Sequence, residues 1–92
     1  MKLTKKDKRY LLHIGYIQED LTEIEKVSKY IRCKLCIFGN TVRNVKRAYI
    51  SDYLSRETYI SGLARATFHK TAVRPIDKMD ISNTTIFFDR IK

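Results

Sequence analysis

Hydrophobic positions along the chain switch between a helical and a strand spacing. In residues 4–13 and 20–31 they recur every three or four positions, as in a helix that buries one face. Thr4 with Asp7 three residues later fits a capping box, and Asp20 with a glutamate three residues later repeats it. The pattern therefore predicts a first helix over 4–13, ended by a glycine, and a second helix that begins at Asp20.

The spacing changes to two between Ile31 and Ile37, where apolar and polar positions alternate until a Gly-Asn pair supplies a turn. Residues 84–91 alternate in the same way and are dense in β-branched and aromatic side chains. Residues 73–76 contain a proline, which suits an edge strand. We therefore expect strands over 31–37, 73–76 and 84–91, with the last two joined by a wing loop over 77–83.

Helical spacing appears twice more, in a basic stretch from Val45 to Leu54 and, after a break at Ser55, in a stretch that runs to Lys70. Helix, turn, helix and paired strands in that order are typical of winged helix-turn-helix proteins, in which the second helix enters a groove of DNA. The sequence thus predicts an α+β fold, a small winged-helix-like domain whose helices precede a C-terminal β-hairpin. Its 92 residues fit one domain, 1–92.

The net charge of the chain is the strongest indication of a binding partner. Nineteen Lys and Arg stand against ten Asp and Glu, which gives a net charge of +9 and an attraction for a polyanion. The partner attracted by this charge could be nucleic acid, an acidic protein surface or anionic lipid. With 43% hydrophobic residues, three Gly and one Pro, the chain should fold and not behave as a disordered tail. Its apolar runs are too short to span a bilayer, and no signal peptide is visible, so we expect a cytoplasmic protein without a membrane partner.

Two sets of residues are candidates for binding nucleic acid. A basic patch would contact phosphates, with strong salt dependence and no sequence choice, although the same charges could serve solubility alone. This patch comprises Lys5, Lys6, Lys8, Arg9, Arg32, Lys34, Arg43, Lys46 and Arg47. The second set would read a groove from the 55–70 helix and grip phosphate from the wing. It comprises Arg56, Thr58, Ser61, Arg65, His69, Lys70, Arg74 and Lys78.

Arginine carries this second hypothesis because its two-pronged donor matches guanine O6 and N7. Small neighbours at Ser61 and Gly62 would let the helix approach the bases closely. The alternative is an ordinary solvated helix face.

Catalysis and metal binding find little support in the sequence. The two histidines lie far apart, the acidic residues form no motif, and the glycines make no phosphate loop, so we expect a non-enzymatic protein without a cofactor. Cys33 and Cys36 have the spacing of a zinc knuckle. Positions three apart on a strand point to opposite faces, however, so we expect thiols and no metal site.

Ser61 to Arg74 and the ending Ile86 to Arg90 resemble small uncharacterised proteins of Gram-positive phage and plasmid mobile elements, which pair a similar helix with a closing strand. Such elements encode DNA-binding regulators and inhibitors of host defence, including anti-CRISPR proteins. The resemblance thus implies either a protein that binds double-stranded DNA or an inhibitor that binds a Cas nuclease or its nucleoprotein complex. A third expectation is an accessory structural protein that self-associates, and a homodimer would also suit paired DNA half-sites.

Overall fold

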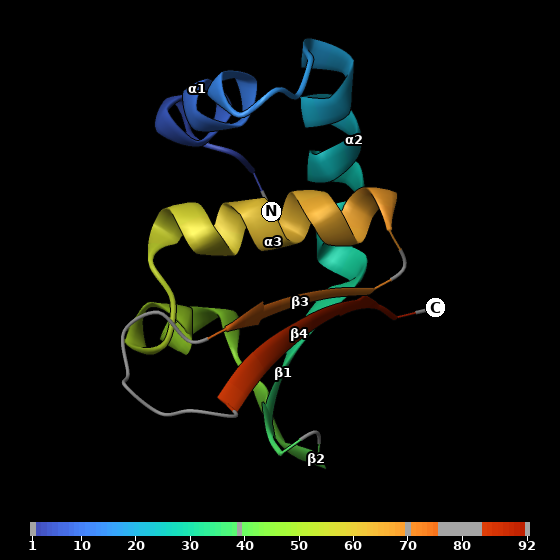
Figure 1. Cartoon of the computed structure of the whole chain (residues 1–92). Helices are drawn as coiled ribbons and strands as arrows, with labels where there is room; N and C mark the ends of the chain where they lie inside the picture. The colour runs from blue at the N-terminus through green and yellow to red at the C-terminus, as the bar shows by residue number, and fades with distance from the viewer. Residues whose placement is uncertain (1, 39, 70, 76–83, 92) are drawn as a thin grey trace.

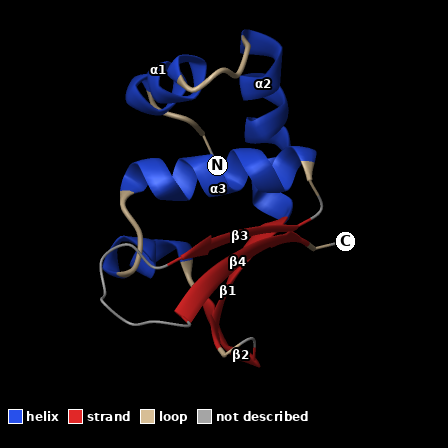
Figure 2. Cartoon of the chain, viewed as in Figure 1, coloured by secondary structure: helices blue, strands red, loops and turns tan. Residues whose placement is uncertain are grey.

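The computed structural model describes residues 2–38, 40–69, 71–75 and 84–91. These residues form an α+β domain of helices and one antiparallel sheet, which confirms the predicted class (Figure 2). Along the chain the elements are α1 (Lys5–His13), α2 (Gln18–Val27), the short 3-10 helix η1 (Ser28–Tyr30), β1 (Ile31–Ile37), β2 (Asn40–Val45), a second 3-10 helix η2 (Arg47–Asp52), α3 (Arg56–Phe68), β3 (Thr71–Pro75) and β4 (Thr84–Arg90).

The four strands lie in the order β2-β1-β4-β3, and each neighbouring pair is antiparallel. The two central strands pair without interruption, with Cys33 opposite Phe88 and Leu35 opposite Ile86. A register shift between Leu35 and Cys36 interrupts the pairing of β1 with β2. The edge strands are therefore β2 and β3, and the predicted C-terminal hairpin forms one half of a continuous sheet.

The three α-helices form two layers over one face of this sheet (Figure 1). Helix α3 lies across the sheet, and α1 and α2 lie on the side of α3 that faces away from it. Gly62 marks how closely α3 approaches β4, because a Cβ atom at this position would lie 2.6 Å from Cε2 of Phe88. The Phe88 ring also packs against Tyr59, with 5.9 Å between the ring centroids. Helix α3 is thus the centre of the hydrophobic core, covered on two sides.

The helices begin where local capping signals predict, except that α2 begins earlier than predicted. The capping box at Thr4 is confirmed: its hydroxyl accepts from the Asp7 amide at 3.1 Å, and the Asp7 carboxylate accepts from the Thr4 amide at 3.0 Å. Helix α2 begins before the predicted Asp20, which lies in its first turn and accepts from the Ile17 amide at 3.0 Å. Aspartate is favoured both as the cap and inside the first turn, so the start was placed too late.

The predicted helix from Val45 to Leu54 is wrong. Strand β2 occupies residues 40–45, and only the 3-10 helix η2 follows. Pairing with β1 draws residues 40–45 into the sheet, although the apolar residues of this segment, Val42 and Val45, do not alternate as in a strand. The helix-turn-helix part of the expectation therefore lacks its first helix.

The other predicted elements are present. Ser55 begins α3, and its hydroxyl accepts from the Thr58 amide at 3.2 Å. Strands β1 and β4 match the predicted strands, and β3 begins at Thr71, two residues before the strand predicted over 73–76. The end of that predicted strand and the predicted wing loop, 77–83, lie outside the described residues. Within the described ranges, no helix has both the length and the apolar character needed to cross a membrane.

Candidate nucleic-acid interface

The structure separates the predicted basic patch into two groups. Lys5, Lys6, Lys8 and Arg9 belong to α1, in the layer of helices farthest from the sheet. The remaining cations belong to β1, to β2 and to the residues that lead from β2 into η2, on the other side of α3 from α1 (Figure 1). They are Arg32, Lys34, Arg43, Lys46 and Arg47.

Two adjoining hollows lie among the cations of this second group, and both are lined by Asn44 and Val45. The first has a volume of about 320 Å³ and is lined by Arg43, Asn44, Val45, Lys46, Tyr49, Asp52 and Tyr53. The second has a volume of about 390 Å³ and is lined by Lys29, Ile31, Arg32, Cys33, Asn44, Val45, Arg47 and Ile91. We call the residues that line the two hollows the β2–η2 surface. Its cations converge because β2 pairs with β1, which brings residues 40–45 beside residues 31–37.

Two tyrosines line the first hollow together with its cations. The Arg43 guanidinium carbon lies 5.4 Å from the centre of the Tyr53 ring, which is the geometry of a cation–π contact. Tyr49 is 56% exposed, although tyrosine carries a large apolar ring. Both tyrosines belong to a short turn fixed by its own backbone, since the Tyr49 amide donates to the Lys46 carbonyl and the Tyr53 amide to the Ile50 carbonyl, each at 3.0 Å.

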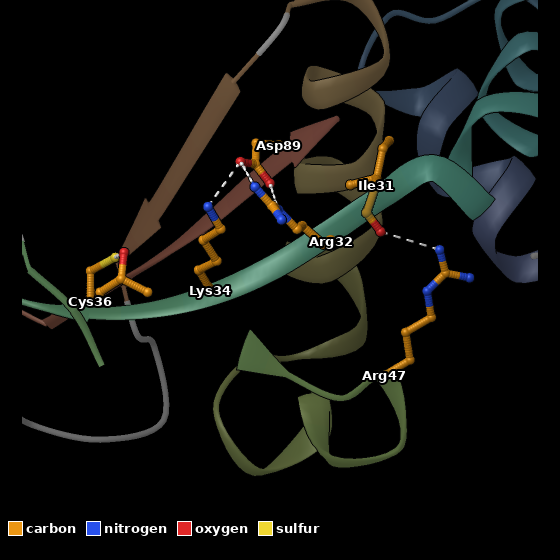
Figure 3. A network of polar contacts seen from close by, with 7 residues as sticks. Ile31, Arg32, Lys34, Cys36, Arg47 and Asp89 are labelled. Carbon is orange, nitrogen blue, oxygen red and sulfur yellow. Dashed lines mark hydrogen bonds and ion pairs between the residues drawn. The ribbon is translucent and has the colours of Figure 1, made fainter. Parts of the chain in front are cut away.

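Arg47 ties η2 to the start of the sheet. Its guanidinium donates to the carbonyls of Ser28 and Ile31, the latter at 3.4 Å (Figure 3). These carbonyls belong to η1 and to the first residue of β1. Arg47 therefore holds the β2–η2 surface in place while its charge remains beside the second hollow.

Asp89 on β4 pairs with the cations of β1. Its carboxylate accepts from Arg32 Nε at 2.9 Å and lies 3.4 Å from the Lys34 ammonium (Figure 3). Burial alone would raise the pKa of Asp89, but the hydrogen bonds from Arg32 and Lys34 outweigh it and hold the pKa below its ordinary value. Asp89 thus neutralises part of the charge on this face of the sheet.

The predicted reading helix is recessed between two layers. Buried positions lie on most of its surface, namely Tyr59, Ile60, Gly62, Leu63, Ala64, Ala66 and Thr67. Arg65 is exposed, and Thr58 and Ser61 are half-buried on the same narrow stripe. The Thr58 hydroxyl lies 2.9 Å from that of Ser55. His69 caps the C-terminus of α3, where its amide donates to the Arg65 carbonyl at 2.8 Å.

Arg56, at the start of α3, pairs with a buried acid. Its guanidinium lies 2.6 Å from the Asp7 carboxylate. Of the residues predicted to grip phosphate, Arg74 belongs to β3, while Lys70 and Lys78 lie outside the described residues. The structure thus brings Thr58, Ser61 and Arg65 together on one stripe and assigns Arg56 to an internal ion pair.

Cys33 and Cys36 belong to opposite faces of β1, as the spacing predicts, because β1 pairs with β4 in unbroken register. Burial raises the pKa of the Cys33 thiol to about 12, while Cys36 Sγ lies 3.7 Å from the Thr41 hydroxyl. Across the described ranges, no three His, Cys, Asp or Glu side chains gather where they could hold a metal ion.

Several residues of the β2–η2 surface were not among the binding residues predicted from the sequence. Tyr49 and Tyr53 fit the core stripe of the wrongly predicted helix, and Asn44 carried no signal of its own. The Gly-Asn pair that follows residues 31–37 was the available indication of a hairpin.

Comparison with protein-family models, with curated proteins and with solved structures finds no match. The winged-helix assignment is therefore not confirmed, and the α+β class stands on the structure itself.

Proposed function

We propose that the protein is a non-enzymatic nucleic-acid-binding module that contacts phosphates through the β2–η2 surface. The observation that carries the proposal is the gathering of cations around two adjoining hollows at an edge strand. These cations are Lys29, Arg32, Arg43, Lys46 and Arg47. Two acidic residues offset part of this charge, because Asp52 also lines the first hollow and Asp89 pairs with Arg32. The five cations still outnumber these two acids, so the surface is positively charged.

Phosphate binding is the chemistry that such a surface supports best. Lysine and arginine that meet phosphates release condensed counterions, and this release supplies most of the affinity of sequence-independent binding. Arg43 and Lys46 are exposed, so both side chains can reach a ligand in solvent. A net charge of +9 would add long-range attraction at low salt.

The stripe on α3 supports the same function less well. A helix that reads DNA must enter a groove, but α3 has α1 and α2 on one side and the sheet on the other (Figure 1). Arg56, the cation at its N-terminus, is engaged by Asp7. We therefore move the proposed interface from α3 to the β2–η2 surface.

The test compares two double variants that remove one arginine and one lysine each. Arg43→Ala with Lys46→Ala alters the β2–η2 surface, and Lys5→Ala with Arg9→Ala makes the same charge change on α1. Fluorescence anisotropy with labelled DNA across a salt series gives the affinity and its salt dependence. For duplex DNA, the first pair should lower the slope of log K against log salt by about 2, since each phosphate contact contributes about 0.9.

The α1 pair should leave that slope nearly unchanged. Equal losses in the two pairs would contradict the proposed location, because they would show that net charge alone drives binding. A loss confined to Arg65→Ala would move the interface back to α3. An absence of binding at low salt would contradict the function itself.

A further inference from the structure

The first hollow of the β2–η2 surface combines two kinds of wall. Tyr49 comes from η2 and Tyr53 from the residue that follows η2, while Arg43, Asn44 and Lys46 come from β2 and the residue that follows it. Tyr53 is half-buried under the Arg43 guanidinium, so its ring already has a partner. The ring contacts found among the described residues leave Tyr49 out. The hollow thus has one exposed aromatic ring beside two cations.

The backbone that carries this exposed ring is anchored to the core. Ile50, the residue after Tyr49, is buried in the core, and Leu54 is fully buried four residues later. The Leu54 amide donates to the Ile50 carbonyl at 2.9 Å, which closes the end of η2. Because the backbone at Tyr49 is already ordered, stacking of a flat ligand costs only the rotamer freedom of the side chain.

The size of the hollow favours one flat group over a helix. Ligand pockets of proteins span about 300–1,000 Å³, and this hollow, at about 320 Å³, is at the small end of that range. A double helix presents its bases edge-on, and their faces are covered by stacking, so a duplex has no base face to offer to Tyr49. An unpaired base has such a face, and stacking on an aromatic ring is the usual way in which proteins hold single strands.

We propose that the β2–η2 surface takes a single-stranded nucleic acid, with one unpaired base stacked on Tyr49 in the first hollow. This inference rests on the proposed function. Lys46 and Arg43 contact the phosphates on either side of the stacked base, and the Asn44 amide both donates and accepts hydrogen bonds at the base edge. The strand continues past Asn44 into the second hollow, where Lys29, Arg32 and Arg47 supply further charge.

The test uses single strands of deoxythymidine and of uridine and a mixed-sequence duplex, each of about twelve nucleotides. An abasic single strand of the same length retains the phosphates without the bases. The single strands should bind about tenfold or more tightly than the duplex at about 0.15 M salt, and the abasic strand should lose most of that advantage. The two single strands share the stacking chemistry, and the tighter of them identifies DNA or RNA as the source.

Tyr49 variants then locate the base. Tyr49→Ala should weaken single-strand binding about 10- to 100-fold, while the salt slope stays the same, because the phosphate contacts remain. Tyr49→Phe should keep the affinity within about twofold, since it keeps the ring. The chain contains no tryptophan, so Tyr49→Trp gives a single reporter whose fluorescence should be quenched by the single strand and not by the abasic one.

The outcomes separate this inference from the proposed function. If the duplex binds as tightly as the single strands and Tyr49→Ala has no effect on affinity, the stacked base is contradicted. Phosphate binding through the β2–η2 surface would still stand. If neither single strand nor duplex binds, both fail. Loss of binding in Tyr49→Phe with a native circular-dichroism spectrum would also contradict stacking.

Discussion

Asp7 and Arg56 join the first turn of α1 to the first turn of α3 through an ion pair of 2.6 Å. Asp7 is only 4% exposed, and the same carboxylate also accepts from the Thr4 amide. One side chain thus closes the capping box of α1 and attaches the outer layer of helices to the central helix.

Removal of that carboxylate should loosen the outer layer. We expect Asp7→Ala to lower the free energy of unfolding by about 1–3 kcal/mol, since it deletes a capping interaction and leaves the Arg56 guanidinium without its partner. Urea denaturation followed by circular dichroism measures the change. Lys5→Ala, an exposed change in the same turn, is the control and should stay within about 0.5 kcal/mol of the parent protein. An equally small effect of Asp7→Ala would contradict the role of the pair.

Acid should destabilise the fold through the same residue. Burial by itself would raise the pKa of Asp7, but hydrogen bonds from Arg56 and Thr4 outweigh it and hold the pKa below its ordinary value of 3.8. A lowered pKa in the folded state means that the stabilisation is complete above the ordinary pKa and is lost as pH falls through the folded-state pKa. Asp89 has a lowered pKa as well and acts in the same direction.

Urea denaturation at a series of pH values below about 5 tests this linkage. We expect the free energy of unfolding to fall as the pH falls, with a shallower dependence in Asp7→Asn, which has no carboxyl group to protonate there. The same pH dependence in Asp7→Asn and in the parent protein would show that Asp7 does not contribute.

Local signals were sufficient for much of the fold. The capping residues Thr4 and Ser55 and the alternation of residues 31–37 and 84–91 act within a few positions, so the sequence shows them directly. Strand β2 was missed because Val45 and Tyr49 also fit a helical spacing, and the pairing with β1 that decides the outcome depends on residues outside the segment.

The candidate site was harder to predict for the same reason. Lys29 and Arg32 approach Asn44 only through the pairing of β1 with β2. The sequence does carry a signal for the recessed position of α3, since the small residues Gly62, Ala64 and Ala66 lie on several sides of this helix. Small residues of this kind allow close packing on more than one side, and that leaves a narrow face for any ligand.

Gly62 should tolerate no added side chain. A Cβ atom would lie 2.6–2.9 Å from the Phe88 ring, and that ring is fully buried and cannot swing into solvent. We expect Gly62→Ala to lower the free energy of unfolding by about 1–3 kcal/mol through overpacking, despite the gain in helix propensity. A double-mutant cycle with Phe88→Leu measures the cause, because a smaller partner should recover part of the loss. Additive losses in the cycle would contradict a direct clash.

Substitutions of Arg47 and Lys46 should differ in their effect on stability although both weaken binding. Arg47 donates to two backbone carbonyls, whereas the Lys46 side chain is exposed. We expect Arg47→Ala to lower the free energy of unfolding by about 1–2 kcal/mol and Lys46→Ala to change it by less than about 0.5 kcal/mol. Both variants should weaken binding to DNA. Equal stability of the two variants in urea denaturation would contradict the role of Arg47 as a tie.

The location of the interface is the central claim, and an amide-resolved NMR titration with a short DNA tests it most directly. At about 0.15 M salt, we expect the largest chemical-shift changes at residues 40–53, with smaller ones at Lys29 and Arg32. The exposed stripe of α3, Thr58 to Arg65, and the basic residues of α1 should change little. Shifts concentrated on α3 or α1, with residues 40–53 unaffected, would contradict the proposed interface.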